Sequence, residues 1–282
     1  MQKENADSEE FKMLVRILSS IVLTVVFAAV LVSQLYLPFI FTLFIAFLSV
    51  TAANELFGAF SLKEEKALKV FAMISAVAIA FLVKTNYLII VYVLALVVLF
   101  ALCLVYYGKQ PISKMAAYYM MSLLVASSFS SGILLMGKED KASGIILFAL
   151  GLVASWFADI GGYFGGRFFG KRKLCPKISP KKTVEGVIGG FVLSLICFML
   201  VGLLIEGAFN KEISYISLAV ISIMSTPISI IGDLTFSVIK RESGIKDYGK
   251  LIPGHGGILD RFDGVAFTLP IVFVIDKFLP IL

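Results

Sequence analysis

The sequence is poor in the residues on which many soluble and secreted proteins depend. It has one histidine, one tryptophan and three cysteines, and only 16% of its 282 residues are charged. Cys103, Cys175 and Cys197 are odd in number and scattered, which excludes a disulfide framework or a cysteine-rich metal site, so we interpret them as small apolar side chains. The first 16 residues mix acidic and basic side chains, which argues against a cleaved signal peptide.

Apolar residues are abundant instead, at 59% of the chain, against about 45–50% in soluble domains. They gather in blocks close to the roughly 20 residues that a helix needs to cross a bilayer. The sequence therefore predicts an all-α polytopic integral membrane protein with about nine transmembrane helices. The predicted spans are 14–36, 37–60, 67–83, 87–107, 115–136, 143–163, 187–205, 215–236 and 265–282.

The net charge of +6 is expected for a membrane protein with basic cytoplasmic loops, so it does not require nucleic acid as a partner. If the nine spans alternate, 20 of the 25 Lys and Arg residues fall on the side that includes the N-terminus. Cytoplasmic loops carry such an excess. The pattern predicts a cytoplasmic N-terminus, an outward C-terminus and the lipid bilayer as the surrounding partner.

No internal repeat or low-complexity tract divides the chain, so residues 1–282 are read as one membrane domain. Within it we separate N-terminal helices at 14–136 from a catalytic half at 143–282. Two long polar loops, 164–186 and 237–264, are predicted on the cytoplasmic side of the second part. They hold most of the unusual side chains.

The first polar loop has features that suit an anion. Asp159, at the end of an apolar run, is costly in lipid unless it is paired or faces a cavity. Ser179–Thr183, with its proline and two lysines, resembles a helix start, and a helix N-terminus attracts phosphate. Two plainer readings stay open: a solvated basic loop with a capped helix, and glycines at 161, 165, 166 and 170 that serve helix packing.

The second polar loop brings carboxylates and cations close to the membrane boundary. Asp260 and Asp263, three residues apart, would share one face of a helix, and Asp233 precedes them at the end of an apolar run. Carboxylate oxygens suit Mg²⁺, and neighbouring basic residues suit the phosphates that Mg²⁺ often accompanies. His255 lies among glycines whose backbone could approach an anion. An ion-pair network with a structural histidine is the alternative.

These loops resemble a known family. The segment SVIKRESGIKDYGKLIPGHGGILDRFD, residues 237–263, matches the signature of the phosphatidate cytidylyltransferases, or CDP-diacylglycerol synthases, of the bacterial type. DIGGYFGGRFFGK at 159–171 and SPKKTVEG at 179–186 resemble the same family, with Gly162 where alanine is usual. Glu55, in the second span, is similar to an acidic position of the family.

The resemblance implies transfer of CMP from CTP, or dCTP, to phosphatidic acid in phospholipid biosynthesis, with Mg²⁺ as cofactor and a second cation, divalent or K⁺, left open. Asp233, Asp260 and Asp263 would then hold the metal. Lys181 and Lys182 would hold the triphosphate. His255 and its neighbouring glycines would bind a phosphate oxygen.

Together these considerations define the predicted site. The candidate catalytic residues are Asp233, Asp260, Asp263 and His255, with the three aspartates also as metal ligands, and the candidate substrate-binding residues are Lys181, Lys182, Thr183, Ser237, Lys240, Arg241, Lys246, Asp247, Gly256, Gly257 and Arg261.

Other functions share parts of this pattern. A CTP-dependent lipid-alcohol kinase and a CDP-archaeol-type synthase would also combine several spans with nucleotide binding. A transporter is the alternative of another class, although acidic residues at the centres of the spans are few. The resemblance further implies the bacterial inner membrane with a cytoplasm-facing active site, and the glycine-rich surfaces are compatible with a homodimer.

Overall fold

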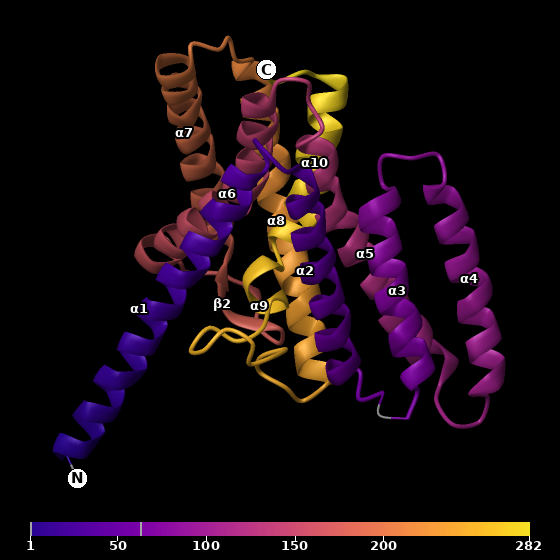
Figure 1. Ribbon diagram of the computed structural model, residues 1–282. Coiled ribbons are helices and arrows are strands. Elements are labelled where there is room, and N and C mark those ends of the chain that lie inside the picture. The colour runs from indigo at the N-terminus through magenta and orange to yellow at the C-terminus, as the bar shows by residue number, and fades with distance from the viewer. Residues whose placement is uncertain (1, 63) are drawn as a thin grey trace. The chain divides into compact units, whose positions relative to one another are not determined.

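A computed structural model describes residues 2–62 and 64–282, and the side chains of 13–62 and 64–282 (Figure 1). The described chain is helical apart from one two-stranded hairpin, which confirms the predicted all-α class. The elements are α1 (Gln2–Ser33), α2 (Pro38–Ala59), α3 (Lys66–Leu82), α4 (Leu88–Val105), α5 (Ile112–Leu135), α6 (Lys141–Phe169), β1 (Lys173–Cys175), β2 (Ser179–Thr183), α7 (Val184–Phe209), α8 (Tyr215–Glu242), α9 (Leu259–Phe262) and α10 (Val265–Phe278).

The chain forms two compact units. Unit 1 contains the chain up to Ala126 together with Ser243–Phe262, and unit 2 contains Ser127–Glu242 together with Asp263–Leu282. The loop that carries most of the predicted signature thus belongs with the N-terminal helices. Its last residue, Asp263, belongs with unit 2.

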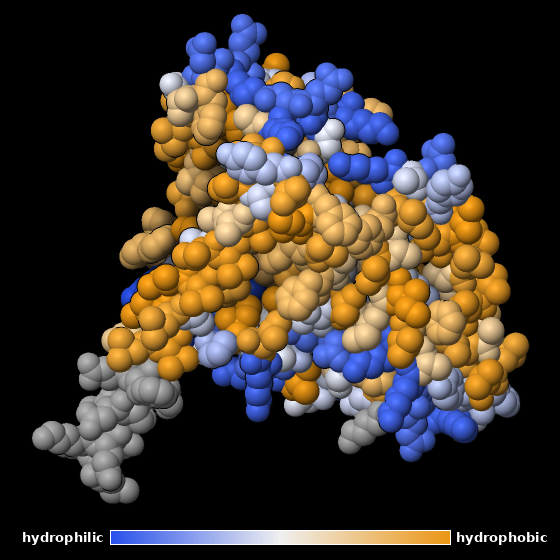
Figure 2. Space-filling model, in the orientation of Figure 1, coloured by the Kyte–Doolittle hydropathy of each residue, from blue (hydrophilic) through white to orange (hydrophobic). Residues whose placement is uncertain are grey.

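The helices have the lengths and surfaces of membrane spans. Seven helices within the described residues are long and apolar enough to cross a bilayer, whereas α3, with 17 residues, and α10, with 14, are shorter. Large apolar side chains are exposed along α1 and α4, where Figure 2 shows hydrophobic surface. Such surface would be unfavourable in water but suits acyl chains. The chain is an integral membrane protein.

Unit 1 is a layered packing of helices. α2 packs on α3, and α3 packs on α4. A small core of Ala76, Ile79 and Ala126 fills the space between them, with Val50 and Leu123 packed against it. α1 contacts α2 after a short turn that begins beyond Ser33 and leads to Pro38 at the start of α2. This arrangement buries one side of α2, including Glu55, against the rest of the unit.

Unit 2 is built around close contact of α6 with α7, and α8 and α10 complete the bundle. A methyl group at Gly161 would lie 2.6 Å from the carbonyl oxygen of Gly189, and one at Gly165 would lie 2.9 Å from Gly189 Cα. Small residues let two helix backbones approach in this way. The glycine spacing read from the sequence therefore serves packing within one chain, while the homodimer stays a prediction.

The expected helix start at Ser179–Thr183 is wrong. These residues form β2, which pairs with β1 in an antiparallel hairpin, and α7 begins only at Val184. Thr183 is the N-cap, because its Oγ1 accepts a hydrogen bond from Gly186 N at 3.1 Å. Lys181 and Lys182 thus lie on a strand before the helix rather than in its first turn.

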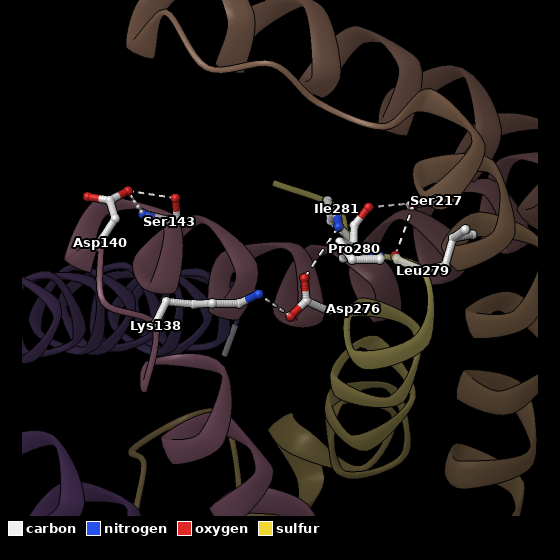
Figure 3. Close-up of polar contacts among 8 residues, drawn as sticks. All are labelled: Lys138, Asp140, Ser143, Ser217, Asp276, Leu279, Pro280 and Ile281. Carbon is white, nitrogen blue, oxygen red and sulfur yellow. Dashed lines mark hydrogen bonds and ion pairs between the residues drawn. The ribbon is translucent and has the colours of Figure 1, made fainter.

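The C-terminal end of unit 2 is held by polar contacts (Figure 3). Lys138 Nζ lies 2.7 Å from Asp276 Oδ2, and Asp276 Oδ1 accepts a hydrogen bond from Ile281 N at 3.3 Å. Ser217 Oγ lies 3.1 and 3.0 Å from the carbonyl oxygens of Leu279 and Pro280. These contacts attach the last residues of the chain to α8 and α10.

Candidate active site

In unit 2, two of the predicted aspartates come from different segments and approach each other. Asp233 lies on α8, and Asp263 lies in the turn before α10. Their glycine neighbours permit the approach: a methyl group at Gly232 would lie 2.9 Å from the carbonyl oxygen of Asp263. One at Gly264 would lie 2.6 Å from Ser229 Oγ, also on α8. Larger residues at either glycine would push α10 away from α8.

Cations and a hydroxyl group accompany these carboxylates. Lys182, from β2, forms an ion pair with Asp233. Ser237, one turn further along α8, places its Oγ 3.4 Å from Asp233 Oδ1. Lys240, in the last turn of α8, interacts electrostatically with Asp263. Lys182, Ser237 and Lys240, all residues of the predicted site, therefore accompany the Asp233–Asp263 pair in unit 2.

The cluster carries more negative than positive charge. Asp159, on α6, interacts electrostatically with both Asp233 and Asp263, so three carboxylates face Lys182 and Lys240. Burial and the charge of Asp233, with a smaller effect of Asp159, raise the pKa of Asp263 above the usual range of an aspartate. An added cation would offset this repulsion.

A cavity of about 260 Å³ lies beside the cluster in unit 2. Its wall includes Asp159, Tyr163, Lys181, Lys182 and Thr183. An aspartate and two lysines along one cavity suit a ligand that carries both phosphates and a bound cation. Lys181 and Lys182, the predicted phosphate-binding residues of the first loop, thus line one cavity. The β1–β2 hairpin positions them there, rather than the expected helix start.

The carboxylates of unit 2 fit Mg²⁺ better than a metal that needs a complete protein cage. Within the described part of the chain, no group of three or more His, Cys, Asp and Glu side chains is arranged as a metal site. Mg²⁺, however, typically uses one or two carboxylates and completes its shell with waters and substrate phosphates. Asp233 and Asp263 fit that donor set.

In unit 1, the segment Ser243–Phe262, which we call the signature loop, folds around the third predicted aspartate, Asp260. Asp260 Oδ2 accepts hydrogen bonds from Tyr248 N at 2.8 Å and Gly257 N at 3.0 Å. Gly256 has a φ of +89°, which glycine adopts easily, and a methyl group there would lie 2.9 Å from Asp260 Oδ2. Both predicted glycines therefore shape the loop around Asp260.

Glu55 holds the same loop from α2. Its side chain is buried, and its carboxylate oxygens accept hydrogen bonds from Ile258 N and Leu259 N, each at 2.9 Å. A methyl group at Gly249 would lie 2.6 Å from Glu55 Oε1, and one at Gly257 would also clash with this carboxylate. The sequence marked Glu55 only as an acidic position, and its spacing gave no sign of this contact across 203 residues.

His255 contacts α1 in unit 1. Its Nδ1 lies 2.9 Å from Ser19 Oγ, and its Nε2 lies 3.3 Å from Ser20 Oγ. Arg261 Nε donates a hydrogen bond to the backbone oxygen of His255 at 2.8 Å. Ser19 and Ser20 therefore contact a predicted site residue, and nothing in the sequence indicated this contact.

The remaining predicted residues lie at exposed positions. Arg241 lies in the last turn of α8, and Lys246 and Asp247 lie in the loop that precedes α9. The shared helical face expected for Asp260 and Asp263 is wrong, because α9 ends at Phe262 and Asp263 lies in the turn before α10. Gly264 makes this turn possible by fitting against α6 and α8.

Comparison with known proteins identifies the family. The profile described as Cytidylyltransferase family matches residues 14–279. The phosphatidate cytidylyltransferase of Haemophilus influenzae is 38% identical over 169 residues, which cover 58% of this chain and 57% of that protein. The protein of the same description from Bacillus subtilis is 44% identical over 121 residues, covering 43% and 44%. The chain thus aligns with about half the length of these curated relatives. It belongs to the cytidylyltransferase family.

Proposed function

We propose that this protein transfers CMP from CTP to phosphatidic acid, forming CDP-diacylglycerol and pyrophosphate. The observation that carries this proposal is the cluster of Asp233, Asp263 and Lys182 beside a cavity lined by a second lysine. It combines a cation-binding carboxylate pair with phosphate-binding side chains in a protein of the cytidylyltransferase family. The names of the bacterial relatives supply the lipid substrate.

The reaction is a nucleotidyl transfer. A phosphate oxygen of phosphatidic acid attacks the α-phosphorus of CTP, the bond to the β-phosphate breaks, and pyrophosphate leaves with the electron pair. The attacking phosphomonoester loses its second proton near pH 6, so at neutral pH it is a nucleophile without a strong base. The main obstacle is repulsion between two anions. Positioning and charge neutralisation therefore supply most of the catalysis.

The residues of unit 2 would bind the nucleotide. Lys181 and Lys182 on the cavity wall would contact the triphosphate, and the Thr183 cap fixes the end of β2 that carries them. Lys240 and Arg241, in the last turn of α8, would neutralise phosphatidate or the departing pyrophosphate. The ion pair with Asp233 holds the amino group of Lys182 in place before a nucleotide binds.

Mg²⁺ is the proposed cofactor, and Asp233 and Asp263 would hold it. The ion would supply charge stabilisation at the phosphates of CTP. Asp260, whose Oδ2 accepts hydrogen bonds from two backbone N–H groups, stays a predicted metal-binding carboxylate. A second cation, divalent or K⁺, is part of the same prediction.

We place the active site on the cytoplasmic side of the bacterial inner membrane, because the basic residues are concentrated in alternate loops and CTP is a cytoplasmic nucleotide. A reporter fused after Leu282 tests the orientation. With nine spans and a cytoplasmic N-terminus, the fusion should report the outer side. A cytoplasmic signal would reject this topology.

The activity is tested with purified protein, labelled CTP and defined lipids. With phosphatidic acid, label in the α-phosphate should appear in the lipid and label in the γ-phosphate should appear in pyrophosphate. Transfer of the γ-phosphate to a lipid alcohol would identify a kinase and reject the proposal. CMP transfer to an archaeol phosphate but not to phosphatidic acid would assign another lipid substrate.

A further inference from the structure

An apolar groove of about 460 Å³ lies in unit 1 between α1 and α2. This α1–α2 groove is lined on α1 by the face that includes Val15, Leu18, Val22 and Val26, residues spaced at three or four as one side of a helix requires. Its volume falls in the range of about 300–1,000 Å³ typical of small-molecule sites. The signature loop contributes to its wall through Ile252 and neighbouring residues.

One end of the groove is polar and basic. Ser19 lines the groove and lies 2.9 Å from His255 Nδ1. The side chain of Arg16 lies over Gly254, where a methyl group would meet Arg16 Cγ at 2.7 Å. Arg261, bound to the backbone oxygen of His255, adds a second guanidinium group near this histidine. Guanidinium groups bind phosphate with two parallel hydrogen bonds.

The other end is lined by aromatic side chains. Phe27 of α1 and Phe44 of α2 both line the groove, and their ring centroids lie 5.9 Å apart in an edge-to-face pair. From Val15 to Phe27, α1 rises about 18 Å at 1.5 Å per residue. That length is close to one leaflet, or about half of the roughly 30 Å hydrocarbon core. The groove therefore has the length for one acyl chain, with phosphate-binding groups at one end only.

We propose that the α1–α2 groove binds an acyl chain of the phosphatidic acid substrate, while Arg16, Ser19, His255 and Arg261 bind its phosphate. The inference rests on the proposed function and adds the place of the lipid. A phospholipid of the surrounding bilayer would also fill an apolar groove, but its phosphodiester carries only one negative charge. The basic end favours a lipid whose phosphate is a monoester and carries close to two negative charges.

Photolabelling tests the site without relying on activity. The full-length protein in phosphatidylcholine vesicles is labelled with a phosphatidic acid whose acyl chain carries a diazirine, and the labelled peptides are mapped. We expect labels on the groove residues of α1 and α2, removed by excess unlabelled phosphatidic acid and not by phosphatidylglycerol. Equal competition by the two lipids, or labelling elsewhere only, would overturn the proposal in favour of bulk lipid.

A matched pair of variants sharpens the test. Val22→Trp fills the groove, whereas Val25→Trp adds the same bulk to a position of α1 that does not line it; the two valines are equally exposed, at 60% and 61%. We expect Val22→Trp to reduce labelling and to raise the KM for a long-chain phosphatidic acid at least fivefold, with little change for a dihexanoyl one or for CTP. Equal effects of both tryptophans would contradict the site.

The head-group end has its own variant. Arg16→Gln should raise the KM for long-chain and short-chain phosphatidic acid alike, because the contact is to the phosphate. An unchanged KM for both lipids would remove Arg16 from the site. If wild-type protein transfers no CMP but is still labelled in the groove in competition with phosphatidic acid alone, the proposed function fails while the lipid site stands.

Discussion

Two groups of carboxylates in unit 2 differ in how their charge is balanced. Asp276, only 6% exposed, has one cation, Lys138, at 2.7 Å and a backbone N–H donor on its other oxygen (Figure 3). Asp233 and Asp263 share Lys182 and Lys240 with a third carboxylate, Asp159. The first arrangement is complete without a ligand, whereas the second leaves negative charge for a cation to balance.

This difference distinguishes a carboxylate that stabilises the helix bundle from carboxylates that are available to bind a cation. The attraction within a buried ion pair offsets much of its desolvation cost, whereas removing one partner leaves an uncompensated charge and is destabilising. Burial, together with the surplus negative charge of the cluster, raises the pKa of Asp263, and such a perturbed carboxylate is typical of functional sites. Substitutions in the two groups should therefore affect different properties.

The largest effect on activity is expected for Asp263→Asn. Loss of one carboxylate from the proposed metal site should lower CMP transfer by roughly 100-fold or more, as is usual when transition-state charge loses its stabilisation. The melting temperature in detergent should be unchanged or raised, because repulsion with Asp233 is relieved. Near-normal turnover with correctly folded protein would remove Asp263 from the catalytic machinery.

A smaller loss is expected for Lys182→Ala, measured as the KM for CTP. Lys182 lines the unit 2 cavity and pairs with Asp233, so its loss should raise this KM by about 10- to 100-fold, in line with the cost of truncating a partly buried ion pair. Lys177→Ala is the matched control, because this exposed lysine lies on the hairpin turn and does not line the cavity. Similar kinetics for both variants would reject the nucleotide assignment.

Glu55→Ala should affect kcat more than the KM for CTP. It leaves Ile258 N and Leu259 N without their buried acceptor, at a cost of about 1–3 kcal/mol for each unsatisfied group, and loosens the loop around Asp260. We expect a fall in kcat of roughly 10-fold, not rescued by Glu55→Asp, whose shorter side chain should not reach both N–H groups. The exposed Glu64→Ala serves as control.

A Glu55→Ala variant with wild-type kcat would show that the loop does not depend on this carboxylate. A useful second variant is Gly257→Ala, because its methyl group clashes with Glu55. If the clash is the cause, combining it with Glu55→Ala should cost less than the two separate effects added together. Additive losses would argue against a direct contact.

The smallest effect on activity is expected for the pair of Asp276 and Lys138. Lys138→Met leaves Asp276 buried without its cation and should destabilise the protein by about 1–3 kcal/mol, since Lys138 itself is 35% exposed, with kcat unchanged below the melting temperature. Replacing both partners, as in Lys138→Met with Asp276→Leu, should recover much of the stability. A large loss of kcat in a correctly folded variant would show that the Lys138–Asp276 pair takes part in catalysis. It would then not differ in role from the Asp233–Asp263 cluster.

The sequence predicted most of the helices because long apolar runs have few alternatives in a bilayer. The run at 215–236, for example, lies within α8, which ends later because polar residues such as Lys240 extend the helix beyond the apolar part. The signature residues were also recognisable, since their types and spacing are local properties. The contacts between separate elements could not be predicted in the same way.

The errors arise where contacts between elements, rather than the residues of one element, decide local structure. Ser179–Thr183 has a proline and lysines typical of a helix start, but pairing with Lys173–Cys175 makes it a strand. Glu55 contacts a loop 203 residues away, and Ser19 contacts a histidine 236 residues away. Periodicity reports only neighbours along one element, so such contacts need the folded chain.

The central claim is that Asp233 and Asp263 hold the Mg²⁺ required for CMP transfer. The most direct test is the Mg²⁺ dependence of transfer by wild-type protein, Asp233→Asn and Asp276→Asn, each measured at saturating CTP and phosphatidic acid. We predict that transfer requires Mg²⁺ and that only Asp233→Asn raises the half-activating concentration, by roughly 10-fold or more. Metal-independent transfer, or the same half-activating concentration in all three proteins, would contradict the account.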